Sequence, residues 1–298
     1  ENAYGKVSGT WQEADEIYAK NSGTWELVFA AFTATSLTTL SSGSGTFTVP
    51  DGANAIHIQA SVGGGGGAAG GVSYDKAGGE SSGAGGGSGA YVSDKVFTVT
   101  EGETISYSIG GGGAPGNQTA NFGQPKIGSA GTNTTLSGST AGSIFTLGAG
   151  GGASGTGGGV QGPLRTNTSG TAGAATISGT VITSGNFRDI DGSTKSVTTL
   201  TSGPVGTFNQ SGNGTVGANN GNCSGDNCQI GGSPGGTSYA GTIAGGTGSP
   251  QGGSTGGVAG TRGSGGGGGG AQYGTESVTG RAEAGGAGEI QYRFLRVS

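Results

Sequence analysis

The chain has 298 residues, and 77 of them are glycine, several times the usual share of roughly 7%. Only 10% of the residues are charged and 30% are hydrophobic, so we expect the chain not to fold around an ordinary apolar core. The net charge of −5 disfavours nucleic-acid binding, and no apolar run approaches the roughly 20 residues that span a membrane.

The first 30 residues contain a repeat in which Tyr-x-Lys-x-Ser-Gly-Thr-Trp occurs twice, from Tyr4 to Trp11 and from Tyr18 to Trp25. Each copy predicts a short strand, a Ser-Gly turn and a return strand. We expect two small hairpins stacked through these four aromatic side chains. Because isolated hairpins are marginally stable, they should dock onto something else. With the Ser/Thr-rich connector at 31–45 they form a predicted attachment region, residues 1–45.

Three segments have ordinary β-strand patterns: 46–62, 91–109 and 289–297. In the first, a Pro-Asp-Gly turn at 50–52 separates two apolar stretches. In the second, apolar residues alternate with polar ones on both sides of a Glu-Gly turn at 101–102. The last closes the chain as a strand. These segments predict a small β framework that is built mainly from the two ends of the chain.

Between these strands, glycine-dense stretches recur at 63–71, 83–89, 110–116, 148–159, 231–236, 241–257 and 263–270. Such composition often means disorder, but the low net charge gives no self-repulsion that would keep the chain expanded. Glycine strands can instead form polyglycine II, an extended left-handed helix of polyproline II type whose backbone groups all bond to neighbouring strands. Collagen is excluded because the glycine runs break the Gly-X-Y register.

The predicted fold class is therefore mainly β plus polyglycine II. A second domain, 46–298, would combine the β framework with a glycine-rich bundle of polyglycine II helices bearing distal loops, formed by 63–90 and 110–288. Richer sequence joins the glycine stretches at 121–147, 181–210 and 221–231. We expect these connectors to be exposed at the ends of the helices, where binding loops belong.

The densest group of aromatic and charged residues in the glycine-rich region is Phe187, Arg188, Asp189 and Asp191. As a binding loop, it would use Phe187 as an apolar anchor and Arg188 as a forked donor. The alternative is a solvated hairpin with an Asp-Gly turn. Calcium is a third option, although the later acidic ligands of a calcium loop are missing.

Other candidate contact residues lie in the same kind of sequence. Isolated aromatic residues flanked by small polar ones either cover the open face of a glycine layer or contact a partner directly. The remaining candidates for receptor contact are Phe122, Gln124, Phe208, Asn209, Asp226 and Tyr239.

Cys223 and Cys228 enclose Ser-Gly-Asp-Asn, a turn sequence that permits a loop disulfide, and a pair of free thiols is the alternative. His57 alternates with apolar residues in a predicted strand, so a packed or half-exposed histidine is expected. With one histidine, no phosphate-loop motif and no carboxylates placed across a cleft, we expect no enzyme activity, no cofactor and no metal.

The segments 45–67 and 85–113 resemble a glycine-rich module of phage tail fibres and tail-tip proteins, and 285–297 fits its final strand. The repeated KVSGTW/KNSGTW element resembles short repeats near the ends of phage structural proteins. The layout is also similar to the adhesins of T-even phage long tail fibres, in which a polyglycine II sandwich presents variable loops. The resemblance implies binding of outer-membrane proteins or surface sugars.

The sequence thus predicts a tail-fibre tip adhesin, located extracellularly on a virion, that recognises a host surface protein or glycan. Its other partners would be tail-fibre or tail proteins, and both a homotrimer and a monomeric cap remain open. The alternative is a glycine-rich structural protein of a fibre, filament or cell surface. An ice-binding protein and a fibre-tip hydrolase fit less well, for lack of a regular register and of catalytic residues.

Overall fold

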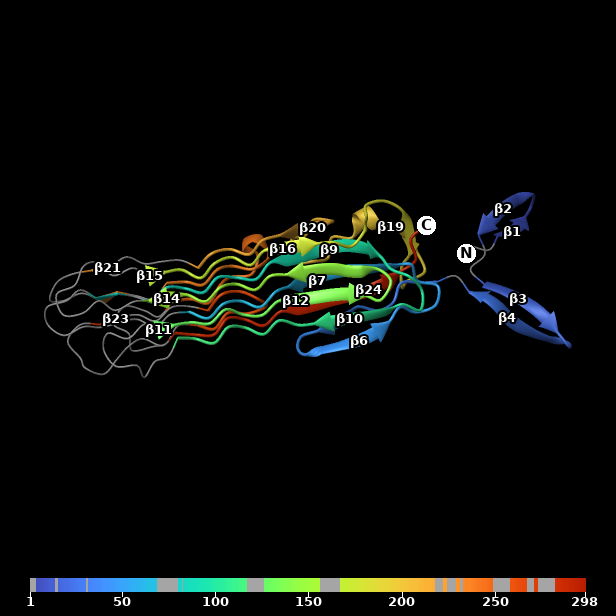
Figure 1. The fold of residues 1–298 in the computed structure, drawn as a ribbon. Coiled ribbons are helices and arrows are strands. Elements are labelled where there is room, and N and C mark those ends of the chain that lie inside the picture. The colour runs from blue at the N-terminus through green and yellow to red at the C-terminus, as the bar shows by residue number, and fades with distance from the viewer. Residues whose placement is uncertain are drawn as a thin grey trace.

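The computed structural model describes residues 4–13, 16–30, 32–68, 80–81, 83–116, 126–155, 167–217, 222–223, 229–230, 233–248, 258–266, 271–272 and 282–298. It is mainly β, and its sheets are antiparallel. No helix in these ranges is long and apolar enough to cross a membrane. From one end to the other, the molecule shows two hairpins, a β-sandwich and a bundle of extended segments (Figure 1).

The N-terminal repeat folds as predicted into two hairpins with Ser-Gly turns. Strand β1 (Tyr4–Val7) pairs with β2 (Thr10–Glu13), and β3 (Glu16–Asn21) pairs with β4 (Thr24–Ala30). In both turns the serine and the glycine have positive φ, 49° and 87° in the first and 49° and 93° in the second. Both residues of a type I′ turn need this conformation, and it matches the twist of the flanking strands.

The sandwich consists of two sheets. The first has the order β16-β13-β12-β10-β6, and the second β17-β9-β7-β24-β5 with β20 also paired to β9. The strands of the first are β6 (Ser44–Thr48), β10 (Thr104–Ser108), β12 (Thr134–Gly138), β13 (Gly142–Leu147) and β16 (Ala175–Ile177). Those of the second are β5 (Thr38–Leu40), β7 (Ala55–Val62), β9 (Tyr91–Thr98), β17 (Val181–Ile182), β20 (Gln210–Gly212) and β24 (Glu289–Leu295).

Alternating apolar residues of both sheets fill the space between them. Ile56, Ile58 and Phe97 from the second sheet meet Leu136 and Phe145 from the first, and all five are fully buried. The predicted framework strands are confirmed, but β12, β13 and β16 come from the middle of the chain. The sandwich is therefore not built from the chain ends alone. Its interior is an ordinary apolar core, so the expectation from composition that the chain lacks one is wrong for this part of the molecule.

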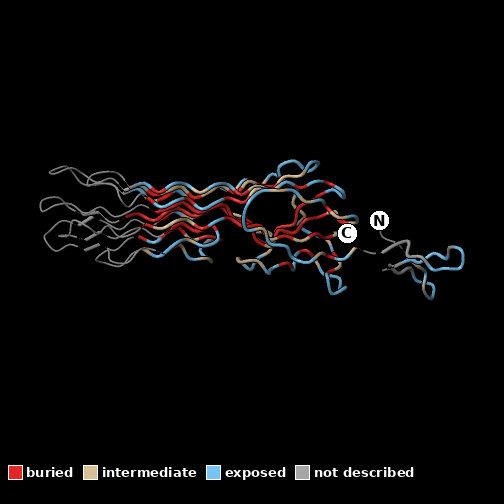
Figure 2. The backbone as a smooth tube through the Cα atoms, turned by 90° about the horizontal axis from the view of Figure 1, so that it is seen from below, coloured by how far each residue is buried: buried red, intermediate tan, exposed pale blue. Residues whose placement is uncertain are grey.

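The bundle, as named here, consists of extended segments called rods: 63–68, 83–90, 110–116, 128–133, 148–153, 169–174, 213–217, 233–237, 244–248, 258–260, 264–266 and 282–288. They run side by side away from the sandwich (Figure 1). Consecutive rods alternate in direction, because the chain leaves the sandwich along one rod and returns along the next. Buried backbone fills the centre of this bundle (Figure 2).

Hydrogen bonds of rod 63–68 repeat every three residues. The N–H groups of residues 63 and 66 donate to rod 83–90, those of 64 and 67 to rod 128–133, and those of 65 and 68 to rod 282–288, at 2.8–3.1 Å. Its carbonyls accept, in the same rotation, from three further rods, 110–116, 148–153 and 264–266. Rod 83–90 bonds to six rods in the same way. A segment that turns by one third per residue produces this pattern.

Glycine is required in these two enclosed rods by the distance between backbones. A Cβ atom on Gly65 would lie 1.9 Å from the carbonyl oxygen of Ser264, and one on Gly66 would lie 1.9 Å from that of Gly151. Among the described glycines with positive φ, none belongs to either enclosed rod, so these glycines serve close approach and not a turn.

Candidate functional site

The end of the bundle that is remote from the sandwich carries short paired strands (Figure 1). One set has the order β11-β14-β15, and the other contains the pairs β21-β8 and β22-β23. Their bounds are Lys126–Ile127, Ser154–Gly155 and Asn167–Thr168 for the first set, and Asn222–Cys223, Glu80–Ser81, Gln229–Ile230 and Ala271–Gln272 for the second. We call this region the far end. Here the threefold bonding of the rods gives way to ordinary antiparallel pairs.

Several predicted contact residues lie close to these strands in sequence, before β11 or between β21 and β22. Phe122, Gln124, Asp226 and Cys228 lie outside the described residues. Cys223 lies in β21, where its backbone pairs with that of Glu80. The predicted loop disulfide and the predicted contacts of these residues therefore stay predictions.

The connector at 181–210 lies at the opposite end of the bundle, and its expected exposed position at a distal tip is wrong. It contains the hairpin of β18 (Asn186–Arg188) and β19 (Thr194–Ser196), followed by the 3-10 helix η1 (Val197–Thr199). Residues 183–209, here called the covering segment, pack on the outer face of the sheet that contains β7, β9 and β24. The physical reason is that consecutive rods run in opposite directions. Connectors therefore lie alternately at the far end of the bundle and at the sandwich.

Phe187 illustrates this correction. Its side chain is only 2% exposed and packs with Val96, Val197 and Leu295. The guanidinium of Arg293 lies 5.6 Å from its ring centroid. Phe187 was predicted to anchor a binding partner, and this is wrong, because the side chain anchors the covering segment to the sheet and leaves almost no surface for a partner. Arg188 is half-buried beside it, and its carbonyl accepts the N–H of Ala34 at 2.8 Å.

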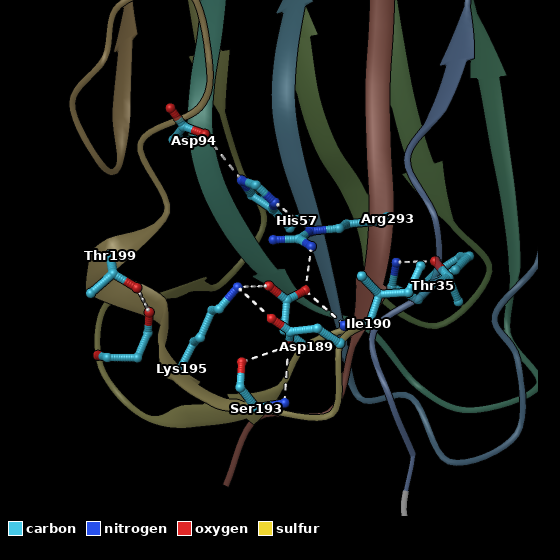
Figure 3. A network of polar contacts seen from close by, with 12 residues as sticks. Thr35, His57, Asp94, Asp189, Ile190, Ser193, Lys195, Thr199 and Arg293 are labelled. Carbon is cyan, nitrogen blue, oxygen red and sulfur yellow. Dashed lines mark hydrogen bonds and ion pairs between the residues drawn. The ribbon is translucent and has the colours of Figure 1, made fainter.

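Asp189 is buried at the centre of a polar network (Figure 3). Its Oδ1 accepts from Nη1 of Arg293 at 2.7 Å, and its Oδ2 pairs with Nζ of Lys195. Burial alone would raise the pKa of Asp189, but the hydrogen bonds from Lys195 and from the Ile190 N–H, together with the charge of Arg293, lower it overall. The carboxylate is thus held ionised between two cations, which leaves it poorly placed to bind calcium.

Asp191, in contrast, is exposed at the turn of the same hairpin. Its Oδ1 accepts from the backbone N–H and the hydroxyl of Ser193, and these bonds lower its pKa. Its Oδ2 lies 3.6 Å from Lys195 Nζ. This geometry agrees with the alternative prediction for residues 187–191, a solvated hairpin with an Asp-Gly turn.

His57 connects the network to the sheet and is fully buried. Its Nδ1 accepts from Nε of Arg293 at 3.3 Å, so its Nε2 donates to Oδ1 of Asp94, also at 3.3 Å. Burial lowers the pKa of His57, and Arg293 lowers it further against the opposing effect of Asp94. The packed histidine predicted from the strand pattern is confirmed. Both ring nitrogens are occupied, so the neutral ring links Asp94 of β9 to Arg293 of β24, the two side chains that bond to the covering segment.

Asp94 and Lys95 fasten the other part of the covering segment. Asp94 adopts φ 47° in β9, and its Oδ2 accepts from the N–H of Gly203 at 2.8 Å. Lys95 donates to Oδ1 of Asn209 at 2.6 Å, and burial lowers the pKa of this lysine. Asn209, with φ 61°, and the half-buried Phe208 therefore belong to the packed layer and not to an exposed tip.

Tyr239 was also expected among the contact residues, but it is fully buried. It begins the 3-10 helix η2 (Tyr239–Gly241) between two rods, and its ring centroid lies 5.7 Å from that of Tyr91. Burial raises its pKa. Its buried neighbours also include Ala60 and Val62, so the ring packs on the sheet that contains β7 and β9 and does not contact a partner.

The attachment aromatics lie at the hairpins, on the side of the sandwich away from the bundle (Figure 1). Tyr4, Tyr18 and Trp25 are 56%, 49% and 65% exposed. Trp11 pairs with Lys6 in the backbone register, as Trp25 does with Lys20. We expected the two hairpins to stack on each other through these aromatic rings. The exposure of Tyr4 and Trp25 contradicts this expectation.

A family model for a glycine-rich domain matches residues 38–295, which include the sandwich, the covering segment and the bundle. The chain belongs to this glycine-rich domain family. The match begins at β5 and ends with β24, so the family domain leaves out the two N-terminal hairpins. No curated protein matches the chain.

The sequence did not single out Arg293, Lys195 or Asp94, which bring the sheet and the covering segment together. Charged residues are scarce, and Arg293 alternates with the apolar residues of β24 that face the sandwich core. A buried cation on the second face of a central strand requires a counter-charge from another layer. The need of Arg293 for a carboxylate partner could therefore have pointed to Asp189.

Proposed function

We propose that the rods are polyglycine II helices. Three observations support this assignment: the three-residue rotation of the hydrogen bonds, the six partners of each enclosed rod and the negative φ of its glycines. The outer rods support it as well. Burial recurs at residues 110, 113 and 116, and residues 128, 131 and 134 are buried, half-buried and buried while 129, 130, 132 and 133 are exposed.

We further propose that the protein is an adhesin of a phage tail-fibre tip that recognises a receptor on a host cell during adsorption. The observation that carries this proposal is the polarity of the molecule. The hairpins lie at one end, and the short strands that lead into the rod-to-rod segments lie at the other (Figure 1). These segments are 69–79, 117–125, 156–166, 218–232, 249–257 and 267–281.

The bundle suits this role because its support is independent of side chains. Enclosed rods bond through main-chain groups, so the sequence of a far-end segment can change without altering the lattice that holds it. The segments combine tyrosine, phenylalanine, asparagine and charged residues, a composition that favours adaptable contacts. The expected ligand is an outer-membrane protein or a surface glycan.

Binding without chemistry is part of the proposal. The one histidine of the chain is buried with both ring nitrogens engaged, which leaves it unsuited to act on a substrate. Localisation on a virion outside the cell, and attachment of residues 1–45 to other tail proteins, follow from the same proposal.

The test uses the full chain and intact bacteria. Segments 69–79, 117–125 and 224–228 are replaced one at a time by glycine and serine of equal length, and binding to a panel of Gram-negative and Gram-positive cells is measured. The control is Ile190→Ser, which changes an exposed side chain at the end near the sandwich. We expect loss of binding, by at least about tenfold, for one or more segment variants and none for the control.

Two results would contradict the adhesin proposal. One is binding that survives all three replacements. The other is growth of the purified chain into long polymers with no cell binding, the behaviour of a structural glycine-rich protein.

A further inference from the structure

Lys95 is a buried lysine without a counter-charge. Its exposed fraction is 7%, and within the described ranges no aspartate or glutamate forms an ion pair with it. Buried lysines are nearly always paired with an acid, because an ammonium ion loses its hydration on burial. Lys195 shows the ordinary arrangement, since it is partly exposed and pairs with Asp189. The position of Lys95 therefore requires another explanation.

The side-chain partner of Lys95 is a carboxamide. Its Nζ lies 2.6 Å from Oδ1 of Asn209 and 3.4 Å from the backbone carbonyl oxygen of the same residue. Burial lowers the pKa of this lysine, so its amine loses a proton more readily than an exposed one. A neutral amine is a nucleophile, whereas an ammonium ion is not. The contact thus places a desolvated amine directly against the carbonyl group of a carboxamide.

The backbone fixes Asn209 beside Lys95. Strand β9 pairs with β17 over residues 96–97 and with β20 over residues 91–93, which leaves Lys95 between the two contacts. In this interval the N–H of Asn209 donates to the carbonyl of Asp94 at 2.7 Å, and Asn209 adopts φ 61°. Two groups held in a reactive geometry within one molecule reach effective concentrations of roughly 10⁵–10⁸ M. Even a slow reaction between them would then be complete within the lifetime of the protein.

We propose that Lys95 and Asn209 form an isopeptide bond that fastens the covering segment to β9. Nζ of the neutral lysine attacks Cγ of Asn209, and a new C–N bond forms. The bond from Cγ to Nδ2 breaks, one proton passes from Nζ to Nδ2, and ammonia leaves. The step consumes no oxidant and no other reactant. The inference does not depend on receptor binding at the far end.

Mass spectrometry of the full chain tests this bond directly. We expect the intact protein to be lighter than its sequence by one molecule of ammonia per chain. The deficit should form faster at mildly alkaline pH, where more of the amine is neutral. Digestion with trypsin should give a branched peptide in which the fragments that carry Lys95 and Asn209 stay joined. An intact mass equal to that of the sequence, after prolonged incubation at mildly alkaline pH, would overturn the proposal.

Two lysine variants distinguish this bond from other losses of ammonia. Lys95→Arg keeps a hydrogen-bond donor for Asn209 but removes the nucleophile, so the deficit should disappear. The matched control is Lys195→Arg, which leaves Lys95 and Asn209 in place and should keep the full deficit. A deficit that persists in Lys95→Arg would overturn the proposal, because the ammonia would then come from another amide. If Lys95→Arg folds poorly, the branched peptide of the original chain still decides, and its absence would overturn the proposal.

Discussion

The sandwich and the bundle enclose buried residues in opposite ways. Between the two sheets, large side chains such as Phe97 and Phe145 exclude water. In the enclosed rods, the largest side chains are alanine and serine, yet every residue is buried. Their stability must come from lateral hydrogen bonds, each worth about 1 kcal/mol net, and from close backbone contact. A chain with few apolar residues can thus bury much of its length by lining up bare backbone.

The largest effect should come from adding a single carbon atom to the bundle. Gly66→Ala places a Cβ atom 1.9 Å from the carbonyl oxygen of Gly151, in a lattice where both backbones are fixed on several sides. We expect a loss of about 4 kcal/mol or more in the free energy of unfolding, measured by urea denaturation. The same change at Gly111, where the nearest atom would be Thr132 Oγ1 at 3.8 Å, should have almost no effect. Equal effects at the two glycines would refute the lattice explanation.

In the sandwich, the damaging change is the removal of carbon atoms. Phe145→Ala leaves a cavity between the sheets, and we expect a loss of about 3 kcal/mol in the same measurement. Val216→Ala serves as the control, because that side chain is 64% exposed on an outer rod and should change stability by less than about 0.5 kcal/mol. A loss below that of the control would mean that the sheets are not held by their apolar interior.

The smallest expected effect on stability comes from the contacts between the sandwich and the covering segment, and it depends on pH. Burial holds the pKa of His57 below its ordinary value of 6.5, so the unfolded chain takes up a proton that the folded chain refuses. Stability should therefore fall as the pH drops below about 6.5. His57→Gln should remove this part of the loss in thermal melts recorded across the acidic range.

The His57→Gln variant should still lose stability at lower pH, through protonation of Asp189. The pKa of Asp189 is held below 3.8, so its ion pairs with Arg293 and Lys195 stabilise the fold above that pH and are lost below it. Identical pH profiles for the variant and the original chain would exclude His57 as the group responsible for the first loss.

Much of the fold could be predicted from local patterns. The Ser-Gly hairpins, the alternating strands near 47, 58 and 105, and the rods at the longest glycine runs follow from turn chemistry and periodicity. The rods at 128–133, 169–174 and 213–217 were missed, because glycine occupies only every third position there, buried or half-buried, and the other residues form no glycine run. A Gly-x-x-Gly spacing was the available signal.

The position of the covering segment could not be derived in the same way. Phe187 and Asp189 look like exposed loop residues when only their neighbours in sequence are considered. Their partners, Leu295 and Arg293, are more than 100 residues away, as the separation of 104 between Asp189 and Arg293 shows. Which end of the bundle a connector occupies depends on the number of rods before it, and several of those rods carry no glycine run.

The three-residue rotation of the outer rods has a genetic consequence. A deletion of one codon within 110–116 or 128–133 would turn every later residue of that rod by one third of a revolution. Side chains that are now exposed, such as those of Ala114 or Ala130, would then point at a neighbouring backbone. Length changes inside these rods should therefore survive selection in multiples of three codons, while the segments beyond the far end follow no such rule.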